Sequence, residues 1–223
     1  MKPLEKAKSL KDQIYEIIKE DILNQKYEND VVLNERKISQ ALNVSKTPVR
    51  EALKALESEG WVEYVPYKGV LVKQMSLADM KNVFRIRKAL EVLMIEMAME
   101  RMSPSVVAEL HESYRQQKRL LEKNQPVVAE FIDYDMEFHG ILVKATGSKL
   151  LTDLILQMRD KSKCFGVQAI FSNRSRYEET ITEHERIYEA VAEGDIEKAK
   201  EAMAYHMDKT YEAAIYFIQK EHK

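Results

Sequence analysis

Residues 34–60, NERKISQALNVSKTPVREALKALESEG, decide the fold of the first part of the chain. Asn34 is a favourable N-cap and predicts a short helix after it. Residues 43–44 form a turn, and Pro48 then lies in the first turn of another helix, where a missing N–H costs little. Gly60 ends that helix as a C-terminal cap. Two short helices joined by a tight turn predict a helix-turn-helix.

Caps and apolar spacing define the two helices of this pair more closely. Ser45 or Thr47 is expected to cap the second helix. Inward-facing apolar positions recur at helical spacing. They are Ile38, Ala41 and Leu42 in the first helix and Val49, Leu53 and Leu56 in the second.

Patterns on either side of this pair complete a domain. Upstream, apolar residues at helical spacing predict a helix over residues 10–23. Downstream, residues 61–65 and 70–74 are rich in β-branched and aromatic side chains and enclose a Pro/Gly turn, which predicts a β-hairpin. Three helices and a hairpin are the components of a winged helix-turn-helix, which we place at residues 1–75.

Basic side chains concentrate in this region, although the whole chain has a net charge of −2. A short helix can enter the major groove with its N-terminal residues at base edges, and its N–H groups attract phosphate. DNA contacts are therefore expected from Arg36, Lys46, Thr47, Arg50, Lys68 and Gly69. For any one of them, the alternative is a solvated charged face on an ordinary helix.

From residue 76 onward the pattern is helical. Serine caps, prolines and glycines separate six helices, at residues 77–102, 104–124, 126–147, 149–171, 175–193 and 196–219. Short connections favour antiparallel neighbours. We therefore expect a mainly α chain, with an all-α six-helix antiparallel bundle at residues 76–223.

Composition excludes several classes of protein. The single cysteine, Cys164, cannot form an internal disulfide, which argues against a secreted disulfide scaffold and favours the cytoplasm. No signal peptide is visible in the first ten residues. The most apolar stretch, residues 92–99, is too short to span a bilayer, and Glu91 and Glu96 interrupt it, so no membrane association is expected.

Four residues of the predicted bundle have the spacing of a metal site. Asp135 and His139 are four apart and share a helix face. His184 and His206 are equidistant from the turn at residues 194–195, so an antiparallel hairpin places them at one level. Imidazole and carboxylate donors suit Zn²⁺ or Ni²⁺, and also Mn²⁺ or Fe²⁺. The alternative is four unrelated side chains that are partly buried or exposed.

Three segments of the first part resemble the signature of GntR-family transcription regulators: residues 33–38, 44–53 and 56–63. The resemblance implies that Arg36, Lys46, Thr47, Arg50 and Gly69 contact operator DNA. The family usually has arginine at the position of Lys46. Lysine cannot form the bidentate fork to guanine, although it can still contact phosphate.

The second part is similar to the FCD effector domain of FadR-type regulators at residues 87–91, 135–139, 183–195, 199 and 206. This resemblance implies a divalent metal on Asp135, His139, His184 and His206, with a small carboxylate beside it. Arginine could clamp the carboxylate bidentately. The candidates are Arg87, Arg174 and Arg176, each of which could instead form a structural ion pair.

Two functions follow. The first is a metal-dependent, small-carboxylate-responsive bacterial repressor that binds palindromic operator DNA as a homodimer. The second is a metalloenzyme on a helical bundle that acts on small carboxylates. We favour a regulator over an enzyme mainly because of the helix-turn-helix signature. In addition, no Gly-x-Ser-x-Gly motif occurs, and Glu183 lies about 100° around its helix from His184, which makes it a poor general base.

Overall fold

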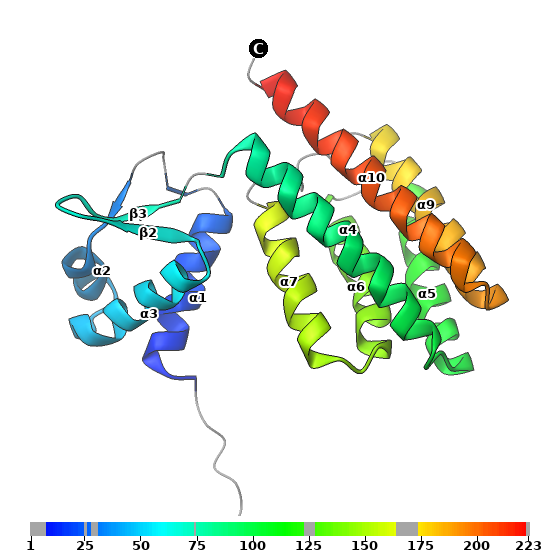
Figure 1. The fold of residues 1–223 in the computed structure, drawn as a ribbon, viewed down its shortest axis with the longest axis horizontal. Coiled ribbons are helices and arrows are strands. Elements are labelled where there is room, and N and C mark those ends of the chain that lie inside the picture. The colour runs from blue at the N-terminus through cyan, green and yellow to red at the C-terminus, as the bar shows by residue number, and fades with distance from the viewer. Residues whose placement is uncertain are drawn as a thin grey trace, which may run out of the picture. The chain divides into compact units, whose positions relative to one another are not determined.

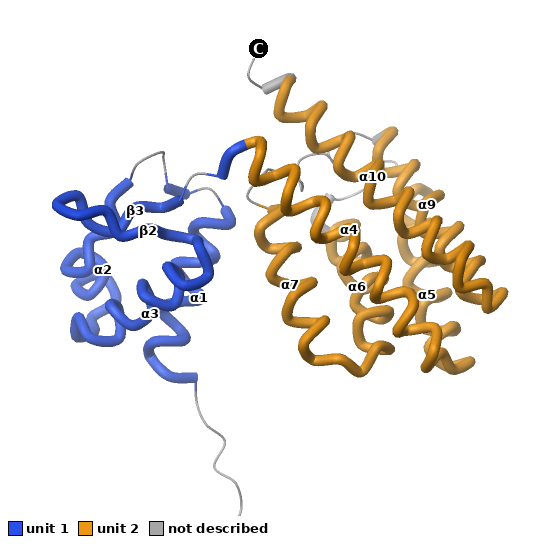
Figure 2. Tube along the Cα trace, in the orientation of Figure 1, with its two compact units in different colours: residues 1–76 blue, residues 77–223 orange. Residues whose placement is uncertain are grey.

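The computed structural model describes residues 8–24, 26–27, 31–73, 75–122, 128–163 and 174–221. The chain divides into two compact units, residues 1–76 and 77–223 (Figure 2). Each unit is considered by itself below.

The first unit contains three helices and a small antiparallel sheet (Figure 1). Its elements are α1 (Leu10–Leu23), β1 (Val32–Leu33), α2 (Glu35–Ala41), α3 (Lys46–Ser58), β2 (Val62–Val65) and β3 (Gly69–Val72). The sheet order is β1-β3-β2, with both pairs antiparallel. The predicted winged helix-turn-helix is therefore confirmed, and β1 adds an outer strand that the sequence did not predict.

The ends of α2 and α3 follow the local sequence. The side chain of Asn34 accepts hydrogen bonds from two N–H groups in the first turn of α2. Asn43 follows α2 with a left-handed φ of +51°, and Gly60 follows α3 with φ +76°. Trp61 N–H then bonds the carbonyl of Leu56 at 2.9 Å, closing a Schellman-type cap. Ser45 is the N-cap residue of α3, without a side-chain cap bond.

Side-chain burial shows which of the predicted inward-facing residues of α2 and α3 are correct. The predicted inner stripe of α3 is confirmed, since Val49, Leu53 and Leu56 are all buried. In α2, however, Ala41 is exposed and Ser39 is the buried residue. The hydroxyl of Ser39 donates to a carbonyl of its own helix at 2.9 Å, which satisfies the polar group and permits its burial.

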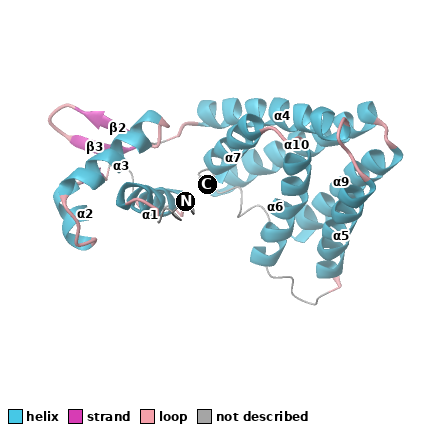
Figure 3. Cartoon of the chain, turned by 90° about the horizontal axis from the view of Figure 1, so that it is seen from below, coloured by secondary structure: helices cyan, strands magenta, loops and turns pink. Residues whose placement is uncertain are grey.

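The second unit is a bundle in which the six predicted helices are all present (Figures 1 and 3). They are α4 (Leu77–Met99), α5 (Pro104–Leu121), α6 (Val128–Ala145), α7 (Lys149–Lys163), α9 (Arg174–Glu193) and α10 (Ile196–Glu221). Residues 123–124, 126–127 and 164–171 of the predicted helices lie outside the described residues. None of the helices described in either unit is long and apolar enough to cross a membrane.

Helix contacts in this unit close a ring. Helix α4 packs against α10, α10 against α9, α9 against α5, α5 against α6 and α6 against α4, while α7 packs on α4. The tight joint between α9 and α10 is made by Gly194, which has φ +75°. This hairpin brings His184 and His206 to one level, with ring centroids 4.8 Å apart.

Two glycines of this unit test the role of backbone conformation. A Cβ added at Gly194 or at helical Gly140 meets nothing within 4 Å. We therefore expect Gly194→Ala to lower the free energy of unfolding by about 1–2 kcal/mol, because only backbone strain is introduced. Gly140→Ala should raise it by about 0.5–1 kcal/mol. Urea unfolding followed by circular dichroism distinguishes them, and equal effects would contradict this account.

Candidate metal centre and DNA-binding surface

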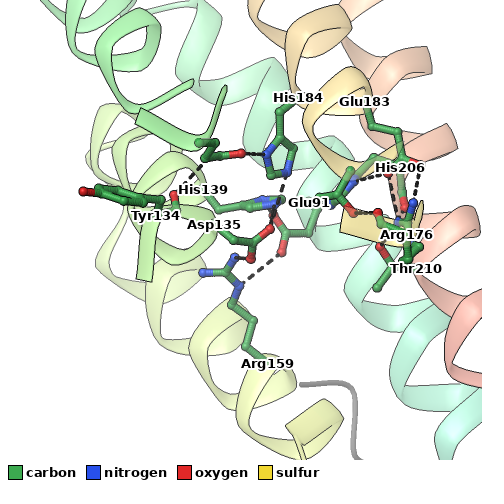
Figure 4. A network of polar contacts seen from close by, with 12 residues as sticks. Glu91, Tyr134, Asp135, His139, Arg159, Arg176, Glu183, His184, His206 and Thr210 are labelled. Atoms are coloured by element: carbon green, nitrogen blue, oxygen red, sulfur yellow. Dashed lines mark hydrogen bonds and ion pairs between the residues drawn. The ribbon is translucent and has the colours of Figure 1, made fainter. Parts of the chain in front are cut away.

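The four residues proposed as ligands converge inside the second unit (Figure 4). Asp135 and His139 come from α6, His184 from α9 and His206 from α10. One donor atom of each lies within 4.8 Å of all the others. The three histidines are buried, and the Asp135 side chain is 14% exposed. Asp135 Oδ1 lies 3.5 Å from His184 Nε2 and 4.0 Å from His139 Nε2.

Each imidazole contacts, through its Nδ1 atom, a side chain on a helix other than its own. The Nδ1 atoms lie at hydrogen-bonding distance from side-chain oxygens: His139 from Glu91 (3.1 Å), His184 from Gln117 (2.6 Å) and His206 from Glu183 (2.8 Å). When Nδ1 donates to such an oxygen, Nε2 keeps its lone pair, which is the tautomer that binds metals. All three rings are thus oriented as ligands.

Gln117 fixes the tautomer of His184 most firmly. Its amide nitrogen donates to the backbone carbonyl of Tyr134 at 3.1 Å, which leaves the amide oxygen facing His184. That oxygen can only accept, so Nδ1 of His184 must carry the proton. Sequence reasoning missed Gln117, because a lone glutamine on an amphipathic helix gives no signal.

Two donor atoms of the cluster lack hydrogen bonds. The Nε2 atoms of His139 and His184 are buried and have no hydrogen-bond partner among the described residues. An unsatisfied buried polar group costs about 1–3 kcal/mol, so such atoms require an explanation. Burial lowers the pKa of both rings, that of His184 well below its ordinary value. Neutral nitrogens aimed at a carboxylate oxygen fit a divalent transition metal.

Glu91 is held in ionised form by its neighbours. Burial opposes its charge, but His139 and two arginines outweigh burial and lower the pKa of Glu91. Arg87 Nε donates to Glu91 at 3.2 Å. Arg159 Nε lies 3.8 Å from Glu91, and its Nη2 lies 3.9 Å from Asp135 Oδ2. Sequence reasoning missed Arg159, which no motif distinguishes from the other basic residues of α7.

The arginines predicted to clamp an effector have other contacts. Arg176 donates to both oxygens of Glu183, at 2.6 and 2.9 Å, and to Thr210 at 3.3 Å. Arg87 is likewise tied to Glu91 and is buried. Both therefore bind carboxylates of the protein itself. The side chain of Arg174 lies outside what the structure describes.

The predicted DNA-contact residues lie at the start of α2, at the start of α3 and at the β2–β3 turn. Five of them are exposed, namely Arg36, Lys46, Thr47, Arg50 and Lys68. Gly69 has φ +105°, and a Cβ there would lie 3.2 Å from Val32. Tyr67, which sequence reasoning missed, is fully exposed at the tip of the turn.

These two units define a two-domain regulator, with a winged helix-turn-helix and a helical domain that carries a separate buried site. Comparison with protein families agrees. Residues 10–72 match the bacterial regulatory proteins of the gntR family, and residues 82–209 match the FCD domain. The chain belongs to the GntR family of transcription regulators and carries an FCD domain, which confirms both resemblances. The family consists of regulators, so the prediction that the chain is not an enzyme is also confirmed.

Several relatives are similar over most of their length. The HTH-type transcriptional repressor RspR of Escherichia coli K12 is 27% identical, over 94% of this chain and 91% of its own. The Uxu operon regulator of Haemophilus influenzae is 28% identical, over 88% of this chain and 78% of the length of that regulator. Among solved structures, E. coli McbR/YncC has a TM-score of 0.74 at 21% identity, over 97% of this chain and 100% of its own. That last likeness concerns the fold.

The anchoring of His184 gives a measurable expectation. Gln117→Ala should lower the affinity for Zn²⁺ or Ni²⁺ about 10- to 100-fold, because the ring loses the acceptor that fixes its tautomer. Gln116→Ala, one position along the same helix, removes only a bond to Glu112 and should leave the affinity unchanged. Competition with a chromophoric chelator measures both. Equal affinities in the two variants would rule out the role given to Gln117.

Proposed function

We propose that this chain is a metal-dependent, small-carboxylate-responsive repressor that binds palindromic operator DNA as a homodimer. The observation that carries the proposal is the pair of buried Nε2 atoms of His139 and His184, beside Asp135, that have no hydrogen-bond partner in the described part of the chain. This set lies in a unit separate from the helix-turn-helix. Zn²⁺ and Ni²⁺ suit the donors best, and Mn²⁺ and Fe²⁺ also fit.

Charge balance supports an anionic ligand beside the metal. The carboxylates around the cluster are Glu91, Asp135 and Glu183, and the guanidinium groups are Arg87, Arg159 and Arg176. Taken as ionised, these six charges cancel. A divalent ion would therefore add two uncompensated positive charges to a buried place, where charge is costly. A carboxylate ligand would offset them, and the metal would supply the Lewis acid that binds its oxygen.

Arg159 is the best-placed arginine to hold such a ligand. Its guanidinium nitrogens lie 3.8 Å from Glu91 Oε1 and 3.9 Å from Asp135 Oδ2, and the guanidinium makes no hydrogen bond to another residue in the described part of the chain. Arg176, by contrast, has two short bonds to Glu183. The donors of Arg159 are therefore available for a bidentate contact with a bound carboxylate.

The helices that hold the site offer a route to regulation. The ligands on α6, α9 and α10 are oriented by residues on α4, α5 and α9, so occupation of the site affects packing around the ring. Helix α4 carries Glu91 and begins at Leu77, directly after the first unit. Ligand binding can thus be coupled to DNA binding. The name of RspR, a repressor, supports the sign of this regulation.

An exposed apolar face of the second unit supports a homodimer. Helices α4 and α7 pack against each other, and both expose large apolar side chains. Ile86 and Leu93 lie seven residues apart on one face of α4, and Leu150 and Leu154 lie four apart on one face of α7. Contiguous exposed apolar surface marks an interaction site, and we infer that the exposed side chains of these two packed helices form one such surface. A two-fold dimer through this α4–α7 face would present two recognition helices to a palindromic operator.

The regulatory proposal is tested on DNA. In a mobility-shift assay, the protein should bind the region upstream of its own gene in a sequence-specific and salt-sensitive manner. Metal together with a dicarboxylate or sugar acid should change the affinity at least about fivefold, as expected for typical allosteric coupling. The His139→Ala, His184→Ala, His206→Ala triple variant should bind DNA without this response.

The control for that variant is His111→Ala, which removes a histidine that stacks on Tyr188 away from the cluster. It should keep both the metal, measured by elemental analysis, and the response. Metal retained by the triple variant would contradict the site. Absence of specific DNA binding by the wild type would contradict the regulatory function.

The dimer has its own test. Leu93→Glu combined with Leu154→Glu should give monomers at micromolar concentration, because two charges enter an apolar interface. Leu156 is also exposed on α7 but lies about 200° around the helix from Leu154, so Leu156→Glu should remain dimeric. Sedimentation velocity measures the mass. A dimer that survives the double substitution would show that another surface is used.

A further inference from the structure

The arginine of the recognition helix is held by a carboxylate from the neighbouring helix. Arg50 of α3 donates from Nε to Glu35 Oε1 at 3.1 Å and from Nη2 to Glu35 Oε2 at 2.9 Å. The two side chains are 60% and 29% exposed, so the pair lies on the surface expected to meet DNA. Arg50 is the only arginine in α3.

This geometry leaves one edge of the guanidinium available. The side-on pair with Glu35 uses Nε–H and one N–H of Nη2. The other N–H of Nη2 and one N–H of Nη1 form the end edge of the group, which can donate to O6 and N7 of guanine together. We propose that Glu35 is a positioning residue that holds Arg50 so that its end edge reads a guanine in each operator half-site. This inference rests on the proposed binding of operator DNA.

The position of Glu35 keeps its carboxylate ionised. It is the first residue of α2, where the helix dipole favours a negative charge. The hydrogen bond from Arg50 lowers its pKa most, partial burial opposes this, and the charges of Arg50, Lys46 and Lys54 lower it further. The surface therefore carries a fixed negative charge among its basic residues.

A negative charge here is unfavourable for binding the phosphate backbone, since non-specific affinity rises with the number of phosphates neutralised. Its presence is explained if it improves recognition of sequence. Lys46, the other basic residue at the start of α3, has no fork with which to read guanine. Bidentate readout from α3 therefore depends on Arg50 and on the side chain that orients it.

Selection from a random duplex pool tests this inference. We expect the full-length wild-type protein to select sites containing a guanine whose replacement weakens binding about 5- to 100-fold. In Glu35→Gln and Glu35→Ala that discrimination should fall to about twofold or less, while preferences at other positions persist. Binding to random duplex should be equal or tighter, because a negative charge has been removed. Arg50→Lys should lose the same guanine preference.

The matched control is Glu51→Gln, which removes the same charge from an exposed acid beside Arg50 and leaves the Arg50–Glu35 pair intact. It should keep the guanine preference. Unchanged discrimination in both Glu35 variants overturns the inference. An equal gain in affinity of the Glu35 variants for selected and random duplexes also overturns it, because Glu35 would then only weaken DNA binding through its charge. Failure of the wild type to select any sequence overturns the proposed operator binding as well, and is recognised without any variant.

Discussion

The second unit depends on one constraint, which is that three buried imidazoles must face one point with their Nε2 lone pairs. Neutral rings have two tautomers, and burial alone does not choose between them. The acceptors at Nδ1 make the choice: Glu91 for His139, Gln117 for His184 and Glu183 for His206. With Asp135 and Arg159 included, all six described helices of this unit contribute a side chain to the site.

This distribution explains how a ring of helices could respond to a ligand at the proposed metal site. The ligands come from α6, α9 and α10, and the residues that orient the rings come from α4, α5 and α9. An ion or ligand that draws the donors together would have to move the helices that carry them. Because these helices are closely packed, such a movement would be transmitted to their neighbours. Because α4 supports His139 through Glu91 and also follows the first unit in the chain, it is the element through which such a change can pass.

The sequence predicts the parts of the fold that local chemistry determines. Asn34 begins α2 with a side-chain cap, Gly60 follows α3 with a left-handed backbone that few other residues allow, and Gly194 fixes the turn that pairs His184 with His206. Strand β1, with two residues, is too short to show alternation, and Ser39 is buried because its hydroxyl is satisfied within its own helix. Gln117 and Arg159 act through contacts between helices, about which their own neighbours in sequence carry no information.

Each unit contains an arginine–carboxylate pair, but a different member of the pair is oriented in each. The carboxylate is oriented in the bundle, and the arginine is oriented on the helix-turn-helix. In the bundle, Arg176 holds both oxygens of Glu183, so that this carboxylate can orient His206. On the helix-turn-helix, Glu35 accepts from Nε and Nη2 on one side of the Arg50 guanidinium and leaves Nη1 outside the pair. In each pair, the charge of one side chain is neutralised by its partner, and the partner in return has a fixed orientation. Where a donor must be aimed at a metal or at a base edge, direction limits recognition more than charge does.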